Sequence, residues 1–151
     1  MKSTAKIENL PFLMRKVSAR ARKQGYSEER IKQIELALEE ALVNVCRYAY
    51  PGACGDVEVL CRKADDKIVV DIIDTGVPFN PESVPDPELD SSSVCSRNLG
   101  GLGCFLIRKM ADEIHYRREN NKNILTLVLG GHAKSAKQDQ AHSKSRGNHV
   151  G

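Results

Sequence analysis

The sequence has no long hydrophobic run and no regular cysteine pattern. No stretch approaches the roughly 18 apolar residues that a membrane-spanning helix needs, and residues 1–9 lack the apolar core of a signal peptide. The five cysteines are odd in number and include no C-x-x-C pair, which argues against a disulfide framework and a structural zinc site. We therefore expect a cytoplasmic protein with free thiols and no membrane segment.

The positive charge is concentrated at the C-terminal end. The net charge is +3, and residues 132–151 contain four Lys or Arg and one Asp, so residues 1–131 sum to zero. A neutral body lacks the basic surface of a nucleic-acid-binding domain. Residues 132–151 also lack hydrophobic periodicity, which predicts a disordered tail after one globular domain over 1–131.

Hydrophobic periodicity predicts a mixture of helices and strands. Apolar residues at helical spacing predict a first helix ending near Gln24-Gly25. A second begins after an N-cap at Ser27 and runs to about Tyr50, where Pro51-Gly52 stops it. From Val77 to Asn98 the chain turns to proline, serine and acid, and we expect a lid, mobile without ligand, over Pro81 to Asn98. Strands are predicted over 56–62 and 67–73, and a helix over 102–111. A hairpin is predicted from two further strands over 114–118 and 124–129.

Three short motifs carry the candidate chemistry. In Glu40-Ala-Leu-Val-Asn44 a carboxylate and a carboxamide lie one turn apart on one helix face. Asp74-Thr-Gly76 ends a strand, and Gly100-Gly-Leu-Gly103 opens a helix whose free N–H groups can hold phosphate oxygens. Each motif alone is common on surfaces and in turns. Their occurrence together, in this order, suits a magnesium-nucleotide pocket.

The combination resembles the ATP-binding domain of the GHKL superfamily, which includes gyrase, a heat-shock chaperone, histidine kinases and mismatch-repair ATPases. The resemblance covers about residues 7–130 and is greatest to the bacterial anti-sigma-factor serine/threonine kinases that act by partner switching. Residues 40–50 are similar to their N box, 74–79 to their first glycine box and 97–107 to their second. This resemblance implies an α/β two-layer sandwich (α+β) of the Bergerat type, with a mixed sheet and its helices on one face.

The resemblance also implies roles for individual residues, with ATP and Mg²⁺ as cofactors. Asn44 would be the magnesium ligand, and Glu40 the general base that accepts a proton from a substrate hydroxyl. Asp74 would accept a hydrogen bond from the exocyclic amine of adenine and select ATP over GTP, and Gly76 would let the backbone approach the base. The other expected ATP-binding residues are Arg97, Gly100, Gly101, Leu102 and Gly103.

Phosphoryl transfer also requires positive charge at the γ-phosphate. Three arginines compete for this role, namely Arg15, Arg47 and Arg97. Arg15 lies near the place where anti-sigma kinases have a catalytic arginine, and Arg47 follows Asn44 by three residues, where related histidine kinases have a phosphate-contacting lysine. We rank Arg15 and Arg47 equally as catalytic candidates.

Apart from the tail, which has no counterpart in the family pattern, the sequence departs from that pattern at two places. Only six residues precede Ile7, so the first strand, which the family often uses to form a homodimer, is short. Lys122-Asn123 stands where many superfamily members have Gly-Thr, so an adenine-side hydroxyl is missing. These departures bear on dimer formation and on nucleotide affinity.

The resemblance implies an ATP-dependent anti-sigma-factor serine/threonine kinase that phosphorylates an anti-anti-sigma partner and binds a sigma factor. One alternative is a non-catalytic ATP-binding interaction module, which the presence of Glu40 disfavours. Another is the catalytic domain of a histidine kinase, disfavoured because no phosphoacceptor helix pair precedes residue 1. A chaperone or repair ATPase is disfavoured because no transducer domain follows residue 131.

Overall fold

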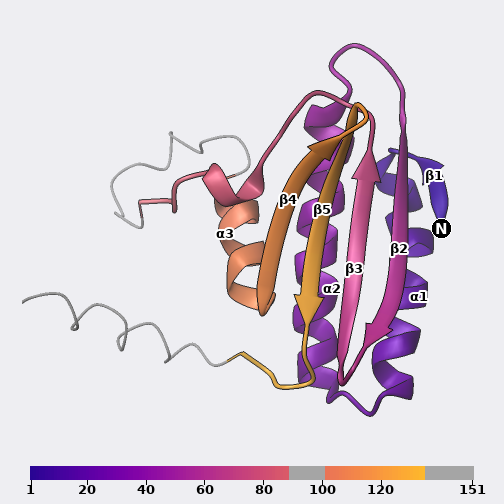
Figure 1. The fold of residues 1–151 in the computed structure, drawn as a ribbon, viewed down its shortest axis with the longest axis vertical. Coiled ribbons are helices and arrows are strands. Elements are labelled where there is room, and N and C mark those ends of the chain that lie inside the picture. The colour runs from indigo at the N-terminus through magenta and orange to yellow at the C-terminus, as the bar shows by residue number, and fades with distance from the viewer. Residues whose placement is uncertain (89–100, 135–151) are drawn as a thin grey trace, which may run out of the picture.

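The protein is a two-layer sandwich in which one sheet carries its helices on a single face (Figure 1). The computed structural model describes residues 1–88 and 101–134. The strands follow the order β1-β2-β3-β5-β4 in the sheet. Their bounds are Lys2–Thr4 (β1), Asp56–Ala64 (β2), Lys67–Asp74 (β3), Glu113–Glu119 (β4) and Lys122–Leu129 (β5). The helices are Leu10–Lys23 (α1), Glu28–Asn44 (α2) and Gly101–Met110 (α3), with short helical segments Ile7–Asn9 (η1), Val45–Ala49 (η2) and Pro81–Ser83 (η3).

The sandwich and the order of its elements confirm the expected fold, with one correction to the sheet. Every strand pairing among the described residues is antiparallel, so the expectation of a mixed sheet is wrong. The connections account for two of these four pairings. Two tight hairpins join β2 to β3 and β4 to β5, and such turns can join only antiparallel strands. Asn120 and Asn121, both at positive φ, form the second turn.

The α2 helix forms the centre of the helical layer. Ser27 caps it by accepting a hydrogen bond from the Arg30 N–H at 3.1 Å, which confirms the predicted start. Its apolar stripe is fully buried against the sheet at Ile31, Ile34, Leu38 and Leu42. The helix ends at Asn44 and continues as one π-helical turn, so the expected end near Tyr50 is reached with a widened last turn. The apolar spacing of this helix also predicts Val45 in the core, but Val45 is only partly buried, because this widened turn lines a pocket.

A buried arginine joins three elements at the end of the sandwich where α2 begins, away from Asn44. The side chain of Arg30 is fully buried and donates to the carbonyls of Met110 and Gly130 and to Asp112. Asp112 also pairs with Lys134. The start of α2, the end of α3 and the end of β5 are therefore held together by one charged network.

Two expectations fall partly on residues that are not described. Residues 81–88 of the expected lid are described and residues 89–98 are not. Arg108 holds the described part by donating to the Pro81 carbonyl and to Asp86, each at 2.6 Å. The expected disordered tail likewise lies outside the described residues from 135 onward. Among the helices that are described, none has the length and apolar character needed to cross a bilayer.

Candidate functional site

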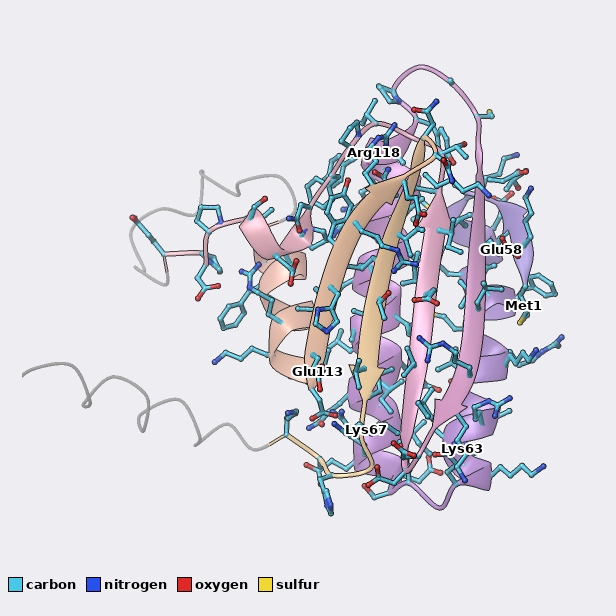
Figure 2. The ribbon with its side chains drawn as sticks, viewed as in Figure 1. Met1, Glu58, Lys63, Lys67, Glu113 and Arg118 are labelled. Atoms are coloured by element: carbon cyan, nitrogen blue, oxygen red, sulfur yellow. The ribbon has the colours of Figure 1, made fainter. Side chains whose placement is uncertain are left out.

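A pocket opens at the end of the sheet where α2 and β3 end and β5 begins. Arg118 lies at this end of the molecule, whereas Lys63 and Lys67 lie at the other (Figure 2). Most of the wall is apolar, and four polar side chains interrupt it. The apolar wall includes Ala41, Ala49, Ile72, Phe79, Pro81 and Leu125, and the polar residues are Asn44, Asp74, Tyr116 and Asn123. A largely apolar cavity with a few converging polar groups is typical of a small-molecule site.

Two side chains of the first motif meet the start of α3. A β-carbon placed on Gly103 would lie 2.6 Å from Glu40 Oε2 and 3.8 Å from Asn44 Oδ1. Glu40 is half-buried and Asn44 is buried, on successive turns of α2. The absence of a side chain at Gly103 thus allows a carboxylate and a carboxamide oxygen to approach the first turn of a helix. The structure brings these three predicted residues together.

The orientation of Asn44 is set by a thiol. Its Nδ2 lies 3.7 Å from Cys104 Sγ as donor, which leaves Oδ1 without a hydrogen bond among the described residues. Burial raises the pKa of the Cys104 thiol. The thiol therefore remains protonated at neutral pH, and Asn44 Oδ1 is an oxygen available as a ligand.

The second motif packs directly on the last turn of the α2 segment. A β-carbon on Gly76 would lie 2.3 Å from the Ala49 carbonyl oxygen, and that oxygen accepts a hydrogen bond from the Val77 N–H at 2.8 Å. Tyr48 and Phe79 add a ring contact with centroids 6.3 Å apart. Gly76 is therefore required for contact with the protein's own backbone, a reason that the sequence does not reveal.

Tyr50 braces the same loop from outside the pocket. Its hydroxyl accepts a hydrogen bond from the Thr75 N–H at 3.0 Å and donates one to the Asp56 carbonyl. Its ring lies where a side chain on Gly55 would stand. This single side chain thus ties the end of β3 to the start of β2.

Asp74 is held by a residue that sequence reasoning did not assign to the site. Asp74 is 7% exposed, and its Oδ1 accepts hydrogen bonds from the Gly76 N–H and from Asn123 Nδ2, both at 2.8 Å. Asn123 is buried and faces Asp74 across the β3–β5 ladder. The signal in the sequence was the replacement of Gly-Thr by Lys122-Asn123, which suggested only a missing hydroxyl.

Some predicted residues lie apart from this group. Arg15 and Arg47 are exposed, neither lines the pocket, and within the described residues no hydrogen bond or ion pair joins either to Glu40 or Asn44. Leu102 is exposed and Gly101 is buried, both at the start of α3. Arg97 and Gly100 lie outside the described residues.

Comparison with known proteins agrees with the fold. The histidine kinase-like ATPase domain family matches residues 3–129, which is most of the chain. The chain belongs to this family. Its fold is similar to the catalytic domain of the histidine kinase ThkA, with a TM-score of 0.53, 13% identity and coverage of 89% of this chain and 98% of that one.

The chain is also similar to curated bacterial proteins. It is 28% identical over 129 residues to the serine-protein kinase RsbW of Bacillus licheniformis, covering 82% of this chain and 80% of that protein. It is 26% identical over 128 residues to the protein of the same name from Bacillus cereus strain Q1, covering 83% and 80% respectively. The family match spans all three motifs.

Proposed function

We propose that this member of the histidine kinase-like ATPase family is an ATP-dependent serine/threonine protein kinase that regulates a sigma factor. The observation that carries the proposal is the approach of Glu40 and Asn44 to Gly103 in the first turn of α3. A proton acceptor, a metal-ligating oxygen and phosphate-binding N–H groups are thereby gathered at one site. The similarity to serine-protein kinases named RsbW supports the choice of acceptor residue.

The residues present fit Mg-ATP. Asp74 Oδ2 receives no hydrogen bond within the described residues and lies on the pocket wall, so it can accept one from an adenine amine. Asn44 Oδ1 is a neutral oxygen of the kind that Mg²⁺ accepts, and Asn44 uses its Nδ2 toward Cys104. The glycines at the start of α3 offer backbone N–H groups to phosphate oxygens. Bound Mg-ATP would supply the phosphoryl group, with the metal offsetting its negative charge.

The chain's own contribution to the chemistry is positioning and proton acceptance. Glu40 would take the proton of the attacking serine or threonine hydroxyl. Asn44 would anchor the metal, and Asp74 would hold the base end of the nucleotide in the apolar pocket. Arg15, Arg47 and Arg97 remain the candidates for charge stabilisation at the γ-phosphate.

The partners follow from the same similarity. An anti-anti-sigma protein would be the phosphoryl acceptor, and a sigma factor would be the sequestered protein. The three-residue edge strand β1 is the part of the chain that would contribute to a homodimer.

Incubation of the purified protein with γ-labelled ATP and the products of neighbouring genes tests the proposal. Label on a serine or threonine of one such product is the expected result. Label on a histidine would instead assign the protein to the histidine kinases. Absence of nucleotide binding would contradict both.

The exposure of Arg15 and Arg47 favours a second candidate, an ATP-binding interaction module that transfers no phosphate. A nucleotide-dependent change in partner binding, without labelling of any partner, would identify this function. The Glu40 variant described in the Discussion separates the two candidates. A module that transfers no phosphate needs no general base, so its function should not change when Glu40 is replaced.

A further inference from the structure

Asn123 links the Asp74 carboxylate to the backbone that follows it. Its Nδ2 donates to Asp74 Oδ1 at 2.8 Å and to the Val77 carbonyl at 2.9 Å, using both amide protons. Asn123 is only 4% exposed and lines the same pocket as Asp74. A threonine hydroxyl has one proton and can make only one of these two donations. The carboxamide therefore does more than replace the hydroxyl that the family pattern would place here.

Two donors on β4 fix which way the Asn123 amide faces. Tyr116 Oη and Arg118 Nη1 each donate to Asn123 Oδ1 at 2.8 Å. An arginine cannot accept a hydrogen bond, so the atom facing Arg118 must be the oxygen and the amide nitrogen must face Asp74. Arg118 also donates to the Gly76 carbonyl at 3.0 Å from this end of the sheet (Figure 2). The orientation is thus set by Tyr116, which lines the pocket, and by Arg118, which does not.

This arrangement leaves the two oxygens of Asp74 in different states. Oδ1 is occupied by the Gly76 N–H and by Asn123, whereas Oδ2 has no hydrogen bond within the described residues. A carboxylate held in this way presents one acceptor oxygen in a fixed direction. A base with an amine at that position gains a hydrogen bond, and a base with a carbonyl meets an unfavourable pair of acceptors.

We propose that Asn123, oriented by Tyr116 and Arg118, is the positioning residue that sets the base selectivity of this site for a 6-amino purine. The inference rests on the proposed function, because it assumes that a purine nucleotide occupies the pocket. It adds to that function the physical device by which Asp74 distinguishes one purine from another. Asn123 acts through Asp74 and needs no contact with the nucleotide.

The test compares the binding of ATP, GTP and inorganic tripolyphosphate to the full chain by calorimetry with Mg²⁺ present. In Asn123→Ala we expect ATP affinity to fall by about tenfold or more, because the carboxylate loses one of its two donors. Affinities for GTP and tripolyphosphate should stay within about twofold, so the ratio of ATP to GTP affinity collapses. Asn123→Thr, which retains one donor, should give an intermediate ratio.

Two further variants keep the test independent of folding. Arg118→Met removes the distal donor at an exposed residue that does not line the pocket, and it should lower the affinity ratio by severalfold. Lys122→Ala, at the exposed neighbour of Asn123, is the matched control and should leave the ratio unchanged. A loss shared equally by all three ligands would show that Asn123 only supports the fold, and would overturn the inference.

The outcomes also separate this inference from the proposed function. If the wild type selects ATP and both Asn123→Ala and Arg118→Met retain that selectivity, the inference is wrong while nucleotide binding stands. If the wild type binds ATP and GTP equally, Asp74 selects nothing and the inference is again wrong. If the wild type binds no nucleotide, both the inference and the proposed function fail.

Discussion

Glu40 and Glu39 are adjacent acids in different surroundings. Glu39 is exposed, whereas Glu40 is half-buried with its Oε2 close to Gly103. If Glu40 is the general base, Glu40→Gln removes the proton acceptor and keeps the shape of the side chain. Phosphotransfer should fall by roughly 10²–10⁴-fold with ATP affinity nearly intact. Single-turnover transfer to a verified partner, together with calorimetry, measures both quantities.

Two companion variants sharpen this test. Asn44→Ala should weaken ATP binding as well as transfer, because Mg²⁺ would lose its protein ligand. Glu39→Gln is the matched control and should transfer phosphate at nearly the wild-type rate. A normal phosphotransfer rate in Glu40→Gln combined with a slow one in Glu39→Gln would assign the general base to Glu39.

The Asp74 carboxylate gives a second prediction at the residue scale. Asp74→Asn exchanges an acceptor for an amide that can donate, so it should cost on the order of 1–3 kcal/mol of ATP binding free energy. GTP has a base carbonyl that can accept a hydrogen bond from the new amide, so its binding affinity should fall less than that of ATP or should rise. Unaltered discrimination between the two nucleotides in a binding titration would remove Asp74 from the selector role.

At the scale of elements, two glycines allow close packing in different ways. A β-carbon on Gly76 would meet the backbone of Ala49, which cannot move aside, whereas one on Gly103 would meet the flexible end of Glu40. Gly76→Ala should therefore lower the free energy of unfolding by about 1–3 kcal/mol. Gly103→Ala should leave stability nearly unchanged but slow phosphotransfer by roughly 10²-fold, because it displaces Glu40.

Urea unfolding and transfer assays on the same two proteins check this contrast. Equal destabilisation by both substitutions would show that Glu40 is held as rigidly as the backbone. A fully active Gly103→Ala would show that the close approach of Glu40 to α3 is not needed for catalysis.

The junction of α2, α3 and β5 predicts a dependence of stability on pH. Burial alone would raise the pKa of Asp112, but hydrogen bonds from Lys134 and the Gly130 N–H, with the charges of Lys134 and Arg30, outweigh it and lower the pKa. A lowered folded-state pKa means that the stabilisation is complete above the unfolded value of about 4 and is lost as pH falls below it.

Asp112→Asn should therefore destabilise the protein at pH 7 by on the order of 1–3 kcal/mol, since it leaves the buried Arg30 charge without its carboxylate. The difference from wild type should shrink as the pH falls below about 4, because the unfolded-state carboxyl takes up a proton there, and it should disappear below the lowered folded-state pKa. Urea unfolding midpoints of both proteins at pH 7 and pH 3 measure this difference in stability. Glu113→Gln, which removes an exposed pair with Lys67, should cost little, and an equal effect of both variants would contradict the role of the network.

At the scale of the whole molecule, one core joins the helical layer to the sheet. Leu42 is fully buried there, and Leu42→Ala should lower the free energy of unfolding by about 2–5 kcal/mol. Leu60→Ala is the same substitution at a residue of β2 that is 44% exposed, and it should cost much less. Similar denaturant midpoints for the two variants would mean that the α2 stripe does not form the core.

The accuracy of the sequence predictions depended on how far apart in the sequence the interacting residues lie. The cap at Ser27, the alternation along β2 and the turn at Asn120 and Asn121 are set by neighbouring residues, so the pattern located them. The mixed sheet was wrong because strand direction between β3 and β5 depends on a pairing that no local pattern specifies. An acid-dependent network around Arg30 was not expected, because an arginine near a helix start is usually solvated.

The sequence by itself determined the family, the order of the elements and the placement of Glu40 and Asn44 on one helix face, because these follow from motif identity and helical periodicity. Only the tertiary structure decided that Asn123 holds Asp74 and that Gly76 rests on Ala49. Asn123 and Asp74 are 49 residues apart, and their contact depends on the register between β3 and β5. Register and interlayer packing are set by the whole core together, so no single segment of the chain encodes them.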